Sequence, residues 1–220
     1  MAETVSGKRS MVRLILGPAL ITLAITVLRL EGELHHWGSP WFSTSAGGGG
    51  AIVGISWLPI IFGPYFALQL AGSGEGALSY GRAFGMTMAG LVVMVLGGVV
   101  LGRSGNSTVL AVIGFVLTLM AALVARVGWR SLGSTLMAYA FAARIPVLIV
   151  MYFAMRGGWG THYDAVGGRF ATTPLWTKFF NEAFLPQMFL WIGYTVVVGS
   201  LFGEIVAAIF ARKPVVQPAS

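Results

Sequence analysis

The chain has 220 residues, of which 56% are hydrophobic and only 10% are charged, and its mean hydropathy is +0.82. An ordinary soluble domain carries about 25% charged residues, so this composition excludes a soluble globule and predicts an all-α integral membrane protein. The chain has no cysteine, which excludes disulfide bonds and thiolate-bound metal centres. Its net charge of +7 is spread thinly between apolar runs, so we expect no nucleic-acid partner.

Six apolar runs are long enough to cross a bilayer, because a hydrocarbon core about 30 Å thick requires about 20 helical residues. We therefore expect a bundle of six transmembrane helices that forms one domain over residues 11–211. This domain follows a short N-terminal segment, 1–10, and precedes a short tail, 212–220. The expected spans are 11–30, 50–70, 84–102, 107–125, 132–155 and 183–211.

The basic residues between the runs predict the orientation, since short loops rich in Lys and Arg face the cytoplasm. With the N-terminus inside, the larger set faces the cytoplasm: Lys8, Arg9, Arg13, Arg82, Arg126, Arg130, Arg212 and Lys213. The smaller set lies outside: Arg29, Arg103, Arg156, Arg169 and Lys178. We expect both termini in the cytoplasm, a multi-pass protein of the bacterial cytoplasmic membrane, and two longer outer segments at 31–49 and 156–182.

Two charged residues lie deep inside the predicted spans, Arg144 in the fifth and Glu204 in the sixth. A charged group inside a bilayer costs at least about 2.5–3.5 kcal/mol, so each one requires a partner or a purpose. The two helices run antiparallel and side chains lean toward the N-terminus of their own helix, so these two lean toward each other. We expect a buried pair that serves a solute or proton pathway or clamps two helices together. Snorkelling of the charges toward the interface is the third interpretation.

The second predicted span contains Pro59 and Pro64, and each proline removes a backbone hydrogen bond. We expect this helix to be kinked or broken. The break of a discontinuous helix exposes backbone groups that bind solutes near the midplane of many transporters, and Ser56, Gly63 and Tyr65 lie beside it. A kink that only improves helix packing is the alternative.

Pairs of glycines four residues apart predict faces where helices approach closely. Gly98 and Gly102 form one such pair, and Gly199 and Gly203 form another. The spacing does not distinguish a partner helix in the same chain from one in another subunit or in a second copy of the protein.

Most of the seven tryptophans fall toward the expected outer side. They form either an aromatic belt at the headgroup level or a flat apolar site for a lipid, quinone or pigment, because a belt normally occurs at both interfaces. Apart from such a contact, we expect no cofactor. The residues of this outer aromatic face are Trp37, Trp41, Trp159, Trp176 and Trp191.

All three histidines are also expected outside, where His35, His36 and His162, with Asp164, supply ligand types that suit zinc or copper. No metal-binding spacing is present, so we favour histidines that bond to backbone or to lipid headgroups. No lysine or histidine lies within a span, and no nucleophile-elbow, P-loop or HExxH motif occurs. We therefore expect no catalytic residue.

Three functions remain open. The first is transport or binding of a small solute through the kinked helix and the Arg144 and Glu204 pair. The second is a non-catalytic accessory subunit of a larger membrane complex, which packs against partner helices, lipid or pigment. The third is a membrane enzyme with a metal site on the outer face.

Overall fold

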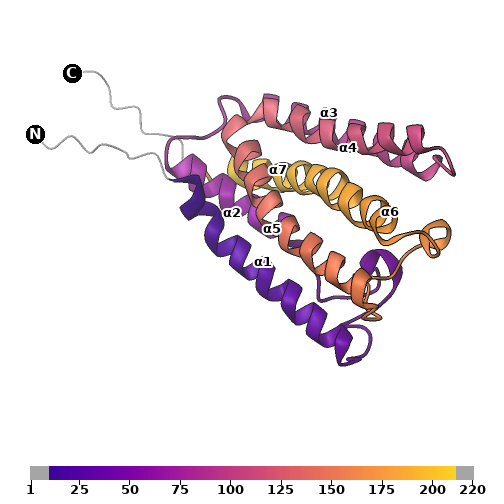
Figure 1. Ribbon diagram of the computed structural model, residues 1–220. Helices are drawn as coiled ribbons and strands as arrows, with labels where there is room; N and C mark the ends of the chain where they lie inside the picture. The colour runs from indigo at the N-terminus through magenta and orange to yellow at the C-terminus, as the bar shows by residue number, and fades with distance from the viewer. Residues whose placement is uncertain (1–9, 212–220) are drawn as a thin grey trace, which may run out of the picture.

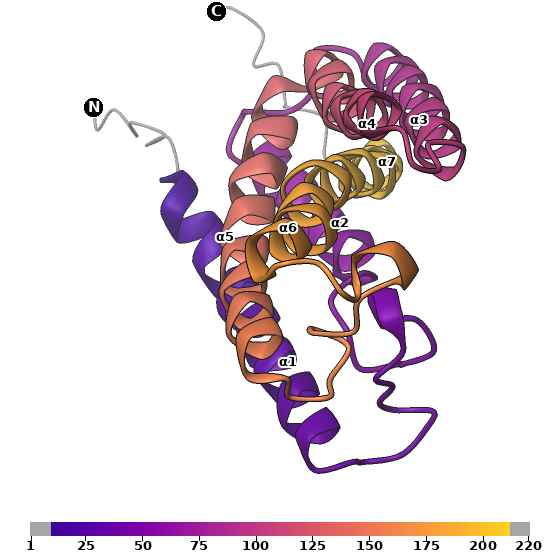
Figure 2. The same cartoon turned by 45° about the vertical axis from the view of Figure 1, so that its right-hand side comes forward.

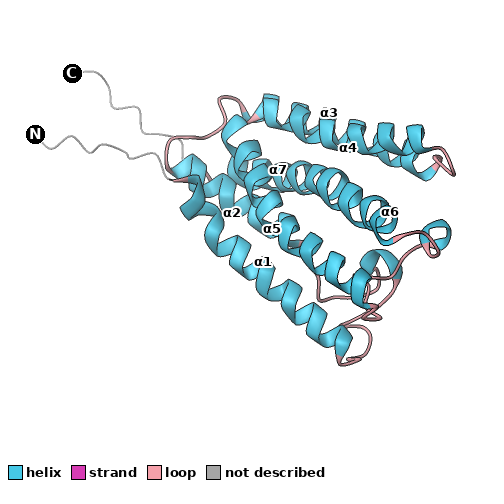
Figure 3. Ribbon diagram, in the orientation of Figure 1, coloured by secondary structure: helices cyan, strands magenta, loops and turns pink. Residues whose placement is uncertain are grey.

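The computed structural model describes residues 10–211, which form helices and loops and contain no strand (Figure 3). Most of these helices are formed by long apolar segments. In a bilayer the backbone N–H and C=O groups must bond to one another, and a helix meets this requirement within one segment. The elements are α1 (Met11–Leu34), η1 (Ala46–Gly48), α2 (Leu58–Gly72), α3 (Tyr80–Gly102), α4 (Thr108–Gly128), α5 (Arg130–Gly157), η2 (Gly168–Phe170), α6 (Leu175–Phe179), η3 (Phe180–Phe184), η4 (Pro186–Leu190) and α7 (Trp191–Phe210).

Five of the helical segments in the described part of the chain are long and apolar enough to cross a membrane. Four of them are α1, α3, α4 and α5, and the fifth is the continuous segment Leu175–Phe210, which joins α6, η3, η4 and α7. Helix α2 is also apolar but has only 15 residues. The architecture is therefore that of a helical, multi-pass membrane protein.

Two elements begin eight residues away from the predicted position, whereas the other bounds differ from the prediction by four residues or fewer. The second apolar run was expected to be helical from residue 50, but α2 begins at Leu58, because Gly47, Gly48 and Gly50 adopt positive φ angles and the chain up to Trp57 is irregular. The last helix was expected to begin at residue 183 and instead begins at Leu175. The predicted tail, 212–220, and most of the N-terminal segment, 1–10, lie outside the described residues.

Helix α7 occupies the centre of the bundle, where it packs against α2, α3, α4 and α5 (Figures 1 and 2). Helices α3 and α4 form an antiparallel hairpin along one side, and α1 packs on α5 on the other. The first residue of α1 and the last of α7 lie at the same end of the bundle, and the long segments 35–57 and 158–174 gather at the opposite end (Figure 1). We call this opposite end the long-loop end.

Small residues bring α2 and α7 into backbone contact. A Cβ atom on Gly63 would collide with the carbonyl group of Gly199, and one on Gly203 would lie 2.8 Å from the carbonyl oxygen of Gly63. Gly199 also faces the side chain of Leu136 on α5. The absence of side chains at these positions therefore determines how close α2 and α7 lie.

Candidate functional site

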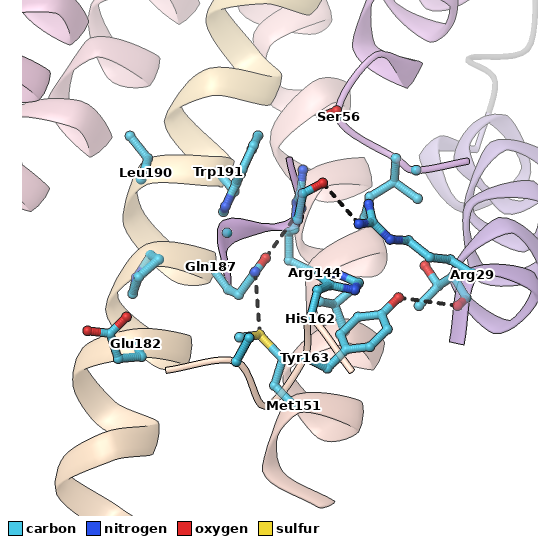
Figure 4. A pocket seen from close by; sticks show the side chains of 18 of the residues that line it. Arg29, Ser56, Arg144, Met151, His162, Tyr163, Glu182, Gln187, Leu190 and Trp191 are labelled. Carbon is cyan, nitrogen blue, oxygen red and sulfur yellow. Dashed lines mark hydrogen bonds between the residues drawn. The ribbon is translucent and has the colours of Figure 1, made fainter. Parts of the chain in front are cut away.

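A cavity of about 300 Å³ lies between α1, α5 and the segment that contains η3, η4 and the start of α7 (Figure 4). The loop residues 47–56 and 162–165 close its remaining sides. Its wall is largely apolar, and its polar lining includes two guanidinium groups, one from α1 and one from α5. The charged, polar and aromatic residues of the lining include Arg29, Arg144, His162, Glu182, Gln187 and Trp191.

Arg144 lies near the middle of α5 and is only 4% exposed. Its Nη1 donates a hydrogen bond of 3.3 Å to the side-chain oxygen of Gln187, and its guanidinium lies 4.6 Å from the centre of the Trp191 ring. The Nε–H group is buried and has no hydrogen-bond partner. No carboxylate of the described residues forms a salt bridge with Arg144. Its positive charge is therefore buried beside a cavity without a counter-ion.

Arg29, by contrast, has a counter-ion within its own helix. Its Nε donates to Glu33 over 2.8 Å, four residues further along α1. Its Nη2 donates to the backbone oxygens of Ser43 and Gly48, over 3.3 and 2.9 Å. Arg29 thus holds the irregular segment 43–48 against α1. No hydrogen bond from Nη1 occurs among the described residues.

Glu33 fixes the second loop to α1 and is only 1% exposed. It accepts hydrogen bonds from the backbone N–H of His162 over 2.8 Å and from the Nδ1 atom of the same ring over 2.7 Å. The next residue, Tyr163, is also buried and donates a hydrogen bond to the backbone oxygen of Thr26 on α1. Arg29, Glu33 and His162 therefore form one network that positions both loops around the cavity.

Burial lowers the pKa of His162 from its ordinary value, although the hydrogen bond and the charge of Glu33 act in the opposite direction and raise it. The lowered pKa favours the neutral form of the imidazole. Because the carboxylate of Glu33 can only accept, Nδ1 of His162 carries the hydrogen. Glu33 forms an ion pair with Arg29 and a hydrogen bond with the imidazole of His162.

Irregular backbone at the depth of a membrane is tolerated where protein buries it or where it lines a cavity. The segment 50–57 meets this condition, since Gly54, Ile55 and Ser56 line the cavity and Gly54 is buried beside Nη1 of Arg29. Three of the eight residues that the predicted second span loses at its start therefore become part of the cavity wall.

The helix on the opposite wall is π-helical over η3 and η4. π-Helical turns are rare and are frequent at functional sites. Pro186 has no N–H group and cannot make the α-helical bond to residue 182, which favours the wider turn. The wide turns place Glu182, Pro186, Gln187 and Leu190 on the cavity, followed by Trp191.

The structure does not join the predicted pair of Arg144 and Glu204. Arg144 contacts Gln187 and Trp191, whereas Glu204 is 2% exposed and accepts a hydrogen bond of 2.9 Å from Thr87 on α3. The prediction used depth along the helix axis, and the two side chains lie on different faces of the bundle. Each is deeply buried, as expected, and each retains one buried polar atom without a partner.

The second helix was predicted to be kinked or broken, and the structure shows no break at either proline. Helix α2 continues through Gly63 and Pro64, and Pro59 stands in its first turn, where a missing N–H group costs no hydrogen bond. Of the residues beside the expected break, Ser56 lines the cavity, Tyr65 is exposed, and Gly63 packs against α7.

The predicted packing glycines divide into two sets. Gly199 and Gly203 lie at close contacts between helices, as their spacing predicts. Gly98 and Gly102 have no neighbouring atom within 4 Å of the position that a Cβ atom would take. On α3 it is Gly97 that faces α4, because the contact face is rotated by one residue from the predicted one.

The tryptophans of the predicted outer aromatic face also divide. Trp37, Trp41, Trp159 and Trp176 are exposed at the long-loop end, which agrees with either interpretation of that face. Trp191 is partly buried and stacks on Arg144, so it belongs to the cavity.

The predicted metal ligands are not gathered together. His35 lies 3.5 Å from Glu31, His162 is bound to Glu33, and Asp164 accepts hydrogen bonds from the backbone of Gly160 and Thr161. His36 has a φ of 53° in the turn after α1. Among the described residues no group of three or more ligand-type side chains is placed to hold a metal ion.

Glu33, Gln187 and Arg29 were not selected as site residues from the sequence, although Arg29 and Glu33 carried one signal. Their spacing of four residues is that of an ion pair on one helix face, which indicates that the first helix continues beyond Leu30. No pattern in the sequence links Glu33 to His162, which lies 129 residues later.

Comparison with known proteins gives no relative: no protein-family model matches the chain, and neither a curated protein nor a solved structure matches it.

Proposed function

We propose that this chain is a multi-pass membrane protein that binds a small anionic solute in the cavity between Arg29 and Arg144 and serves its transport. The observation that carries the proposal is the buried guanidinium of Arg144, a residue of the cavity lining that has no carboxylate in contact and an Nε–H without a hydrogen-bond partner.

The energetics favour an anion as the occupant. An arginine at the centre of a bilayer costs at least about 2.5–3.5 kcal/mol. A desolvated cation–π contact contributes about 2 kcal/mol, so Trp191 and one hydrogen bond to Gln187 offset part of this cost. A carboxylate or phosphate oxygen would accept from the guanidinium and supply the missing negative charge, because the planar guanidinium donates in a fork that matches such anions.

The size and lining of the cavity fit a small ligand. A volume of about 300 Å³ lies at the lower end of small-molecule sites, which combine apolar walls with a few polar groups. Glu182 also lines the cavity, but it has an interaction of its own, and no salt bridge joins it to either arginine among the described residues. The positive charge of Arg144 therefore remains for the solute.

The orientation proposed from the basic residues places the long-loop end on the outer side of a bacterial cytoplasmic membrane. In this proposal α2 also crosses the membrane, which brings the number of spans from five to six. Both termini are then cytoplasmic. The cavity is then walled on its outer side by the two long segments and extends to the level of Arg144, in the middle of α5.

A change in thermal stability on anion binding tests the proposal, since a ligand that binds only the folded state raises the melting temperature. The protein in lipid nanodiscs is heated with chloride, inorganic phosphate, sulfate, acetate or succinate. We expect one class of anion to stabilise the wild type and the matched variant Arg103→Gln, which alters an exposed arginine, but not Arg144→Gln. No stabilisation by any of these anions, or full stabilisation of Arg144→Gln, would contradict it.

A second candidate function, an accessory subunit, is favoured by the outward face of α3. Gly98 and Gly102 contact nothing within 4 Å, so this face is free for close approach of a helix from another subunit. Purification in mild detergent followed by native mass measurement distinguishes the two functions. A stoichiometric foreign chain supports the subunit, and a particle of this chain alone supports the solute-binding protein.

A further inference from the structure

A second buried charged group lies outside the solute cavity, on the opposite half of α7. Glu204 lies six residues before the last residue of α7, which corresponds to about 9 Å along the helix axis. It is therefore close to the end of the bundle where the described chain begins and ends, whereas the cavity of Arg144 lies toward the long-loop end.

Glu204 is one of the residues that line a pocket of about 360 Å³ between α3 and α7, and its carboxyl group is buried beside this pocket. The other lining residues are Tyr80, Gly81, Phe84, Ile205, Ala208 and Ile209. Phe84, Ile205 and Ile209 are exposed on the outer surface of the bundle. The pocket is thus walled by apolar side chains and borders the surface that lipid would cover.

One hydrogen bond satisfies this carboxyl group. The hydroxyl of Thr87 donates to Oε1 over 2.9 Å, and Oε2 is buried with no partner. Thr87 is itself fully buried on α3, so the donor has a fixed position. An ionised carboxylate has the capacity for about four hydrogen bonds, so most of this capacity is unused.

No counter-charge faces Glu204 from the helices that pack on α7. Tyr80 and Thr87 are the polar side chains that α3 presents there, and α2 presents Gly63 and Ala67. The side chains that α4 and α5 pack against α7 at Val197 and Gly199 are aliphatic: Ala121, Ala125 and Leu136. No lysine or arginine of the described residues forms a salt bridge with Glu204.

We propose that Glu204 is a proton-binding site of the membrane domain, where a neutral carboxylic acid is held between Thr87 and the apolar pocket and exchanges its proton through that pocket. An isolated ionised carboxylate in an apolar medium has a high free energy, and the group is neutralised by a proton instead. A sodium ion is a poorer occupant, because the pocket offers it few oxygen ligands besides the carboxyl group and the hydroxyl of Thr87. The site does not depend on the anion cavity, and either one can exist without the other.

Reaction with dicyclohexylcarbodiimide tests this site. This lipid-soluble reagent takes the proton of a carboxylic acid onto one nitrogen, and the carboxylate oxygen bonds to its central carbon. The product rearranges to a stable N-acylurea, whose added mass identifies the modified peptide. We expect labelling of Glu204 in lipid nanodiscs at about pH 7, well above the ordinary glutamate pKa of about 4.3.

Three variants make the result specific. Glu204→Gln abolishes the label, and Glu31→Gln, which alters an exposed glutamate of α1, leaves it unchanged. Thr87→Val removes the hydrogen bond that stabilises the carboxylate and increases the label at the same pH. Infrared spectra of the unlabelled wild type show the carbonyl band of a protonated carboxyl, which is absent in Glu204→Gln.

Other outcomes would overturn the proposal. Absence of both the label and the protonated-carboxyl band at about pH 7 would show that Glu204 is ionised there. Protection from labelling by sodium chloride at constant pH, but not by choline chloride, would assign a sodium ion to the site. If no anion binds at Arg144 but Glu204 still reacts, the proposed solute site fails and the proton site stands.

Discussion

Glu33 on α1 binds His162 in the loop after α5 through two hydrogen bonds, one from the backbone N–H and one from the imidazole ring. The same carboxylate accepts a hydrogen bond from Arg29. One buried acid therefore positions both the guanidinium of Arg29, which lines the cavity, and the loop that contains His162. This contact connects segments that are 129 residues apart. It makes the shape of the cavity depend on one side chain that does not line it.

Removal of the charge of Glu33 is therefore expected to be costly. In Glu33→Gln, Arg29 keeps a buried charge without a counter-ion, and such a loss destabilises proteins by about 3–5 kcal/mol. Thermal unfolding in detergent measures the effect, and Glu31→Gln on the exposed face of the same helix is the matched control. Equal melting temperatures for the two variants would show that the network does not stabilise the fold.

The stability of the fold is expected to fall when the pH is lowered below neutrality. Burial lowers the pKa of His162 in the folded state, while in the unfolded chain it takes its ordinary value of about 6.5. Between the lowered pKa and pH 6.5 the unfolded state therefore binds more protons than the folded state. The contribution of His162 to the free energy of unfolding is present above about pH 6.5 and is lost as the pH falls through the folded pKa.

The melting temperature between pH 7.5 and pH 5.5 tests this dependence on His162. His162→Gln flattens the profile, whereas His35→Gln, at an exposed position, leaves it as in the wild type. Arg29, Glu33 and Asp164 are the charged groups around the imidazole. An unchanged slope in His162→Gln would disprove the assignment.

Two glycine-to-alanine substitutions are expected to differ in their effect on thermal stability. In Gly63→Ala the new methyl group meets the backbone of Gly199, which cannot move without separating α2 from α7, and overpacking of this kind costs about 1–3 kcal/mol or more. In Gly98→Ala the methyl group meets nothing within 4 Å. Thermal unfolding should show a large loss for the first variant and none for the second. A similar loss in both would mean that the outward face of α3 is also a packed interface.

Replacement of Trp191 is expected to weaken anion binding without unfolding the protein. Trp191→Leu removes the ring that faces the guanidinium of Arg144, and a desolvated cation–π contact is worth about 2 kcal/mol. A loss of 1.4 kcal/mol corresponds to about tenfold in affinity. Titration of the stabilising anion, followed by the melting temperature, compares this variant with Trp176→Leu at an exposed site. Equal affinities would exclude a role for Trp191 in positioning Arg144.

The helical architecture followed from the sequence because long apolar runs bounded by charges leave few other structures in a bilayer. The burial of Arg144 and Glu204 was likewise predicted from their positions within apolar runs and is confirmed. Their partners were not predictable, because position along a helix gives depth but not which neighbour a side chain faces. Gln187 lies in π-helical turns, which rotate the helix face. The regular period of an α-helix does not predict this rotation.

The cavity itself depends on contacts that no local pattern encodes. The glycine-rich stretch around Gly47 has no helical or strand pattern, and hydrogen bonds from Arg29 to Ser43 and Gly48 hold part of it against α1. Pro59 was predicted to interrupt a helix and instead stands in its first turn, because that helix begins eight residues later than expected. In both cases the tertiary contacts around the cavity decided the local structure.

The position of a bound anion tests most directly whether the solute binds at Arg144. Crystals of the protein grown in lipid and soaked with selenate or bromoacetate carry an anomalous scatterer on a tetrahedral oxyanion or on a carboxylate. We predict an anomalous peak inside the cavity, with an oxygen of the anion within hydrogen-bond distance of the guanidinium of Arg144, and no such peak in Arg144→Gln. Peaks confined to exposed arginines and lysines, with ordered water alone beside Arg144, would contradict the account.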